Sequence, residues 1–223
     1  MQEAINVLTE WSNINKLGIN AEKTKEMLIY FGKRDLQLQP VKINNINLDR
    51  VHTSKLLGII ISDDLKWASH IKYIVAKASK RLYYLRELKR AGIQTSELNR
   101  VYTSMIRPVL EYCVEVWTTC LTKEQCFQVE SIQRRACKIM LPNDKYEEAC
   151  YTLSLPTLEE RRYQMCKTTF EKIKQDNHKL NYMLVKRNEL KYGLRNQYPY
   201  VKPKCTTNRF RRSFIPWCLY NLN

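Results

Sequence analysis

Glycine is scarce in this 223-residue chain, which contains only five glycines beside 14 tyrosines and four tryptophans. Glycine supplies the positive-φ positions of tight turns, so a chain with few glycines and many aromatic side chains is typical of a helix-rich protein. Hydrophobic residues make up 44% of the sequence, which is enough apolar surface for a core. The composition excludes a disordered chain and predicts a globular protein of one large domain or two small ones.

Long apolar runs are also absent. No stretch approaches the run of about 18 uninterrupted apolar residues that a transmembrane helix requires. The first residues, Met1-Gln2-Glu3-Ala4-Ile5, lack the basic segment and apolar core of a signal peptide. We therefore predict no membrane partner and no secretion signal, and expect an intracellular protein, nuclear or cytoplasmic.

The eight cysteines include no CxxC pair and no Cys/His pairing at the spacing of zinc ligands. Most of them fall within helical patterns, where a free cysteine behaves as a small hydrophobic residue. In the absence of a secretion signal, this usage predicts reduced thiols rather than a disulfide framework.

Catalytic motifs are missing as well. The sequence has no Gly-rich phosphate loop and no HExxH. His52, His70 and His178 stand apart from any acid, cysteine or serine in a recognisable nucleophile arrangement. We predict that the chain contains no catalytic residue, no metal site and no cofactor of its own.

Positive charge is abundant and unevenly distributed. The net charge is +16 and the pI is about 9.5, which indicates a polyanionic partner, most often nucleic acid. Residues 66–91 carry 8 basic groups against 1 acidic, and residues 186–212 carry 9 against 1. These two blocks supply +15 of the net charge, because residues 1–65 and 92–185 are close to neutral.

The first 65 residues are expected to form short strands around one helix. The patterns predict an amphipathic helix over residues 2–17 ended by Gly18, a buried strand over 25–31, a hairpin of 41–43 with 46–48 around Asn44-Asn45, and a strand over 56–61.

The rest of the chain is expected to be helical. We predict a helix over residues 67–90 closed by Gly92, and a second over 96–117 that Pro108 kinks near Arg107. Capping boxes at Thr122–Gln125 and Thr157–Glu160 begin two further helices, the second reaching about residue 175. Beyond residue 186 the periodicity fades and prolines predict an extended tail.

Asp63 and Asp64 lie where the last expected strand meets the long basic helix. Adjacent carboxylates hold divalent metal ions in polymerases. Ser and Asp at such a junction are also suited to cap a helix N-terminus, because their oxygens accept from free N–H groups and their charge suits the dipole. No third carboxylate lies at an obvious position, so capping is favoured over metal binding.

Two basic surfaces are candidates for nucleic-acid binding. On the long helix we select Lys66, Lys72, Lys77, Lys80 and Arg81, because acids are too few there for i,i+4 ion pairs to explain the cations. In the tail, Arg209, Arg211 and Arg212 stand beside Phe210, Phe214 and Trp217, a mixture typical of single-strand binders. The alternative, that these aromatics anchor the tail on the helices, is equally open.

Several segments together resemble one family. They are Leu17-Gly18-Ile19-Asn20-Ala21-Glu22-Lys23-Thr24-Lys25, then Leu56-Leu57-Gly58-Ile59 with Trp67 and His70, then Ile106-Arg107-Pro108-Val109-Leu110-Glu111-Tyr112, and then Gln133-Arg134-Arg135-Ala136. In order and spacing they are similar to the C-terminal part of reverse transcriptases from non-LTR retrotransposons of the jockey type.

The resemblance implies roles for particular residues. Lys23 falls in the palm segment whose lysine assists pyrophosphate departure, and Leu57-Gly58 falls in the hairpin that grips the primer. The family's aromatic-Ala-Asp-Asp turn, which binds the catalytic Mg²⁺ of the complete enzyme, is not in this sequence, so the chain is expected to begin just after it.

The expected fold is therefore α+β: a small antiparallel palm-sheet remnant over residues 1–65, a predominantly helical thumb-like region over 66–185, and a basic, aromatic tail over 186–223. The expected partners are an RNA template and a DNA primer, held by Lys23 and the two basic surfaces. The alternatives are a non-catalytic nucleic-acid-binding module or a helical interaction protein, each derived from a truncated element.

Overall fold

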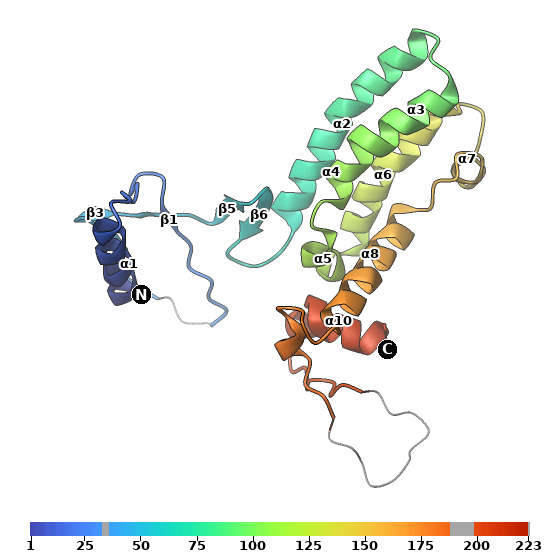
Figure 1. Ribbon diagram of the computed structural model, residues 1–223. Helices are drawn as coiled ribbons and strands as arrows, with labels where there is room; N and C mark the ends of the chain where they lie inside the picture. Colours follow the sequence, from blue (N-terminus) through green and yellow to red (C-terminus); the bar gives the residue numbers. More distant parts are fainter. Residues whose placement is uncertain (33–35, 188–198, 223) are drawn as a thin grey trace, which may run out of the picture. The chain divides into compact units, whose positions relative to one another are not determined.

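The computed structural model describes residues 1–32, 36–187 and 199–222, and it divides into two compact units, Met1–His70 and Ile71–Asn223 (Figure 1). Short strands occur in the first unit and helices dominate the second. The prediction of an α+β chain in which helix predominates is confirmed at this level.

The first unit contains one helix and three separate two-stranded pieces. They are built from α1 (Gln2–Ile14), β1 (Lys25–Glu26), β2 (Lys42–Ile43), β3 (Ile46–Asn47), β4 (Asp49–Arg50), β5 (Thr53–Leu56) and β6 (Ile59–Ser62). The pairs β2–β3 and β5–β6 are antiparallel, whereas β1 pairs with β4 in parallel. The expectation of one antiparallel sheet is therefore wrong for the described residues.

The β2–β3 hairpin has the expected turn. Asn44 and Asn45 adopt φ of 49° and 63°, the left-handed conformations that a two-residue type I′ turn requires and that asparagine tolerates. The hairpin presents Val41, Ile43 and Leu48 to a small core, against which Ile5 of α1 packs.

Two predictions for residues 1–31 are wrong in detail. Helix α1 ends at Ile14, and the left-handed residue that follows is Lys16, with φ of 55°, rather than Gly18. Only Lys25–Glu26 of the expected buried strand is paired, and Phe31 is 52% exposed. The apolar run there has no described neighbouring strand to complete its hydrogen bonds, so its β-propensity alone does not make it a strand.

The expected strand over residues 56–61 is instead a tight hairpin. Strands β5 and β6 face each other with Leu56 opposite Ile59. Leu57 and Gly58 between them take φ of 47° and 91°, so both turn positions are left-handed. Gly58 was the signal in the sequence, because glycine inside an apolar run often marks a turn.

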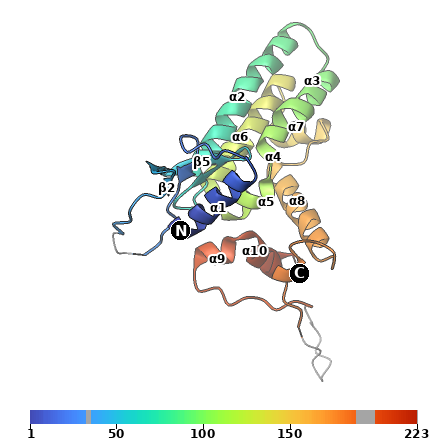
Figure 2. The same cartoon turned by 60° about the vertical axis from the view of Figure 1, so that its left-hand side comes forward.

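The second unit is a helical bundle. Its helices are α2 (Ala68–Arg90), α3 (Thr95–Val101), α4 (Arg107–Glu111), α5 (Val114–Trp117), α6 (Lys123–Met140), α7 (Tyr146–Thr152), α8 (Leu158–Ile173), α9 (Asn208–Arg212) and α10 (Phe214–Asn221). The short helical turns η1 (Tyr102–Ile106), η2 (Thr118–Cys120) and η3 (Asn181–Met183) join them. Helices α2, α4 and α6 lie side by side in both views (Figures 1 and 2).

Helical spacing predicts one apolar stripe for α2, made of Trp67, Ile71, Val75, Ala78, Leu82 and Leu85, and four of these six residues are buried. Ile71, Ala78, Leu82 and Leu85 are fully buried, and Gly92 closes the helix with φ of 83°. Val75 is only partly buried and Ile74 takes its place in the core. The spacing of apolar residues in α6 predicts that Val129, Ile132, Ala136 and Ile139 point inward; the first three are fully buried and Ile139 is only partly buried.

The expected helix over residues 96–117 is interrupted twice. A π-helical turn, Tyr102–Ile106, precedes Pro108, which lacks the amide that would continue the α-helical ladder. This confirms the predicted kink. The second break, at Cys113 with φ of 49°, was not predicted.

Both predicted capping boxes are present. The Thr122 hydroxyl accepts from Gln125 N at 3.2 Å, and the Thr157 hydroxyl accepts from Glu160 N at 3.2 Å. Gln125 and Glu160 return the bond by accepting from the backbone N–H groups of Thr122 and Thr157. These reciprocal bonds satisfy amides that the first helical turn would otherwise leave unpaired.

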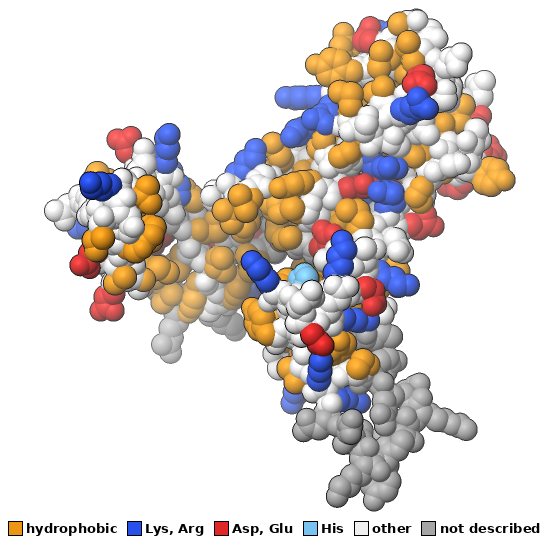
Figure 3. All heavy atoms as spheres, viewed as in Figure 1, with side chains coloured by type: hydrophobic (Ala, Val, Ile, Leu, Met, Phe, Trp, Pro, Cys, Tyr) orange, Lys and Arg blue, Asp and Glu red, His pale blue; other side chains and the backbone are white. Residues whose placement is uncertain are grey.

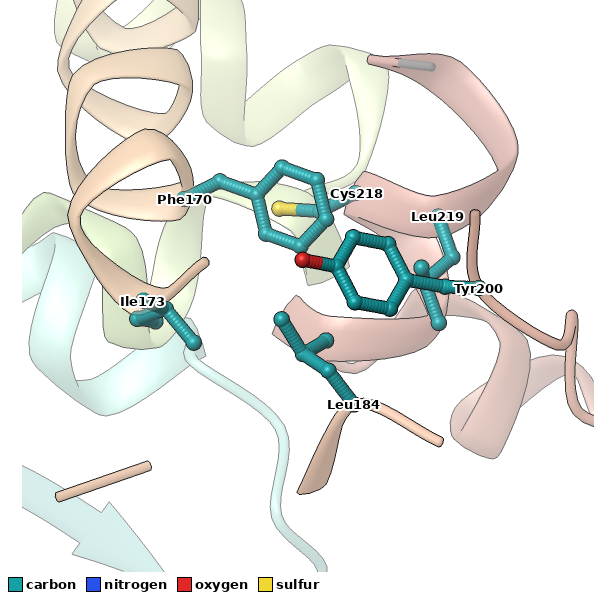
Figure 4. Packing of buried hydrophobic residues seen from close by; sticks show 6 residues of the cluster. All are labelled: Phe170, Ile173, Leu184, Tyr200, Cys218 and Leu219. Carbon is teal, nitrogen blue, oxygen red and sulfur yellow. The ribbon is translucent and has the colours of Figure 1, made fainter. Parts of the chain in front are cut away.

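The C-terminal residues are not extended as expected. Residues 188–198 lie outside the described residues, but 208–212 and 214–221 form α9 and α10. Pro216 is tolerated because it lies in the first turn of α10, where its missing amide needs no intrahelical partner. Helix α10 packs on α8 through Phe170, Ile173, Cys218 and Leu219, with Leu184 and Tyr200 in the same cluster (Figure 4).

All eight cysteines are free, as predicted. Cys137, Cys166 and Cys218 are buried in the second unit. Burial raises the pKa of the Cys137 and Cys166 thiols to about 12, so these groups stay protonated at neutral pH.

Replacing Thr157 by alanine removes the cap of α8, and we expect the free energy of unfolding to fall by about 1 kcal/mol. Chemical denaturation measures this loss. Thr168→Ala, at an exposed position in the same helix, is the control and should change the stability by less than about 0.5 kcal/mol. Equal stability of the Thr157 variant and the wild type would show that the box is not stabilising.

Candidate nucleic-acid interface

The outer face of α2 carries exposed cations that are not neutralised by acids. Lys72, Lys77 and Lys80 are exposed, and none of them forms an ion pair within residues 1–32, 36–187 and 199–222. Lys and Arg side chains are visible along the edge of the second unit over α2 (Figure 3). These three lysines are therefore available to contact phosphates.

Two other selected cations on this segment have partners. The Lys66 ammonium lies 3.5 Å from Asp64 Oδ2. Arg81 donates to the backbone oxygen of Met105, so its guanidinium joins α2 to η1. Arg81 thus contributes to the packing of the bundle more than to its free surface.

Aromatic side chains accompany the lysines, although the charge pattern of the sequence did not indicate them. Tyr73, Lys77, Lys80 and Tyr84 follow one another at spacings that place them on one stripe of α2. Lys77 lies 5.9 Å from the Tyr73 ring centre, and Tyr84 is 60% exposed. The adjacent Tyr83 is 57% exposed and meets Tyr84 edge to face. Cations interleaved with exposed rings suit both phosphates and unstacked bases.

A second stripe of α2 adjoins α6. It contains Lys72, Ser79 and Arg86, spaced by seven residues. Arg135 of α6 donates to the Ser79 hydroxyl at 3.1 Å, which brings a cation from a different helix beside this stripe. Because residues 92–185 are nearly neutral overall, the charge count gave no reason to select Arg135.

The tail separates its arginines from most of its aromatics. Arg209, Arg211 and Arg212 lie on the surface of α9, with Phe210 46% exposed beside them. Trp217 instead packs edge to face against Tyr163 of α8, with ring centres 6.2 Å apart. The anchoring alternative therefore holds for α10, whereas α9 presents an exposed basic surface whose binding of nucleic acid stays a prediction.

Lys23 belongs to the first unit, and so does Lys66. Lys23 is exposed, and its backbone N–H donates to Asn20 Oδ1 at 2.9 Å, within a turn that precedes β1. The other selected cations belong to the second unit.

The acidic pair at the end of β6 does not cap α2, which corrects the expectation. Helix α2 begins only at Ala68, and Asp64 Oδ1 accepts from the backbone N–H of Lys66 at 2.9 Å. Asp63 Oδ2 accepts from His52 Nδ1 at 2.7 Å, so His52 is not isolated from acids as the sequence indicated. His52 and Asp63 meet because β5 and β6 form a hairpin, whereas the expected single strand would have kept them apart.

Among the described residues, no group of three or more His, Cys, Asp and Glu side chains is placed to hold a metal ion. Within the same residues, no helix combines the length and the apolar character needed to cross a membrane. The chain matches no protein-family model, no curated protein and no solved structure.

The His52 hydrogen bond lowers the pKa of the Asp63 carboxyl below its ordinary value. The stabilisation by this pair is therefore complete above the pKa that Asp63 has in the unfolded chain. It is lost as the pH falls through the lower, folded pKa.

We expect His52→Ala to return the Asp63 pKa towards its ordinary value, as measured by carboxyl NMR titration. His178→Ala, which removes a histidine of the second unit, is the control. An unchanged Asp63 pKa in the His52 variant would contradict the pairing.

Proposed function

We propose that this chain is the C-terminal palm and thumb portion of an RNA-directed DNA polymerase from a non-LTR retrotransposon of the jockey type. In this proposal it holds the duplex of RNA template and DNA primer. The observation that carries the proposal is the outer face of α2, where Lys72, Lys77 and Lys80 are exposed and have no ion-pair partner among the described residues.

The chemistry of that face supports backbone binding. Lysine ammonium groups bind phosphates as point charges and read no base sequence, so they position a duplex rather than select one. An RNA–DNA hybrid is recognised mainly by shape and by sugar and phosphate contacts, because its deep major groove excludes side chains. A helix that displays cations along its length suits this mode of recognition.

The β5–β6 hairpin also supports the proposal. Leu57 and Gly58, which the resemblance assigns to the hairpin that grips the primer, form the turn of a two-stranded hairpin, and Leu57 is 84% exposed. An exposed side chain at a hairpin tip is accessible to a ligand. Lys23 keeps the role that the resemblance implies.

The proposal assigns no catalytic residue to this chain. The aromatic-Ala-Asp-Asp turn that would bind Mg²⁺ in the complete enzyme is not in the sequence, and we propose that the chain alone does not extend a primer. Its proposed location is the nucleus or the cytoplasm, where the template would be found.

A second candidate is a helical interaction protein, and α1 favours it. Val7, Trp11 and Ile14 of this helix are 67%, 54% and 74% exposed. Apolar side chains gathered on one short helix are a common feature of protein contact surfaces.

We expect the triple variant Lys72→Gln, Lys77→Gln, Lys80→Gln to bind an RNA–DNA hybrid more weakly than the wild type. The slope of log K against log salt should become shallower by about 0.9 for each phosphate contact that is lost. Fluorescence anisotropy of a labelled hybrid, titrated at several salt concentrations, measures both effects.

The matched control is Lys123→Gln, Lys167→Gln, Lys179→Gln, which removes the same charge at exposed positions of other segments. It should leave the slope close to that of the wild type. If the wild-type protein does not bind the hybrid at low salt, the proposal is refuted and the interaction protein is favoured. If both triple variants lose the same affinity, the loss reflects net charge alone and α2 is not the binding surface.

A further inference from the structure

A cavity of about 540 Å³ opens between the C-terminal half of α6 and the start of α7. Its lining includes four cations, namely Arg134, Arg135, Lys138 and Lys145. Asp144 and Glu147 are the acids in the same lining. None of the four cations forms an ion pair with an acid in the described part of the chain. The cavity therefore has an excess of uncompensated positive charge.

One wall of the cavity is held in place by stacking. The Arg134 guanidinium carbon lies 4.2 Å from the Tyr146 ring centre. The Tyr146 hydroxyl donates to Glu130 and accepts from Gln133 Nε2, and these two hydrogen bonds to α6 fix the position of the ring. A guanidinium stacked by its face keeps its N–H groups at its edge, where they can form two parallel bonds to a phosphate.

The other cations surround the same space. Lys138 follows Arg134 by one helical turn, and the two side chains share a face of α6. Lys145, which also lines the cavity, immediately precedes α7. A volume of about 540 Å³ lies within the range of small-ligand pockets, so it is large enough for a phosphate together with part of its sugar.

Arg135 connects this cavity with the basic surface of α2. It lines the cavity and also donates to Ser79, which lies between Lys72 and Arg86 on their stripe. A polynucleotide that follows this stripe of α2 would therefore meet Arg135 between the stripe and the cavity. This continuity favours a phosphate of a nucleic-acid backbone over a free anion as the occupant.

We infer that the α6–α7 cavity is a binding site for a backbone phosphate of the polynucleotide, held by Arg134 and Lys138, with Arg135 joining the site to α2. The inference rests on the proposed function and adds a second point of attachment to it. It assigns binding to residues that the charge distribution along the sequence did not single out.

The double variant Arg134→Gln, Lys138→Gln tests this inference in the full chain. We expect weaker binding of the RNA–DNA hybrid and a salt slope shallower by about 0.9 if one phosphate contact is lost. Arg134→Lys should recover part of the affinity, because it restores the charge without the paired N–H geometry. The control Arg100→Gln, Lys167→Gln removes an exposed arginine and lysine from α3 and α8 and should have little effect.

The outcomes separate the inference from the proposed function. If the wild type binds the hybrid and the α2 triple variant weakens it, but the cavity variant does not, the inference is overturned and the proposed function stands. If the wild type does not bind, both fail. If NMR shows that inorganic phosphate fills the cavity while the variant leaves hybrid affinity unchanged, the site belongs to a free anion and the inference is again overturned.

Discussion

The buried side chain of Gln133 joins α6 to three other segments of the second unit. It is fully buried, and its amide bonds to three separate segments: Oε1 accepts from the Tyr102 hydroxyl at 2.7 Å, and Nε2 donates to the Tyr146 hydroxyl and to the Pro156 oxygen, each at 3.0 Å. A buried polar group that loses its partner costs about 1–3 kcal/mol, so these bonds fix the π-helical turn, α7 and the approach to α8 relative to α6. The register of the bundle is tied to this one side chain.

The proposed binding surfaces depend on that register. Tyr146 bonds to Gln133 on its inner side and carries the stacked Arg134 on its outer side, so the interior network positions a surface cation. The apolar stripe of α2 then places Lys72, Lys77 and Lys80 on the outside of the bundle. In the same way, the packing of α10 on α8 carries α9 and its arginines. In each case an apolar or buried polar contact in the interior determines where the charged side chains lie on the surface.

Sequence patterns sufficed where a local rule determines the structure. The capping boxes at Thr122 and Thr157, the Asn44-Asn45 turn and the stripe of α2 each depend on residues within a few positions, and each is present. Sequence patterns failed where a partner far away in the chain determines the structure. Residues 27–31 have strand propensity but no described strand beside them, and α10 forms on a surface supplied by α8. Likewise, the Arg135–Ser79 contact joins helices far apart in the chain. The His52–Asp63 pair depends on the turn at residues 57 and 58, which the expected single strand did not include.

The central claim is that α2 and the α6–α7 cavity contact the backbone of a nucleic-acid duplex, and lysine footprinting tests it most directly. The protein is acetylated with and without a saturating RNA–DNA hybrid at low salt, and mass spectrometry quantifies modification at each lysine. The account predicts protection of Lys72, Lys77, Lys80 and Lys138, with Lys123, Lys167 and Lys179 unchanged. The account would be contradicted if the hybrid left the modification of all seven lysines unchanged, or if it protected only Lys123, Lys167 and Lys179.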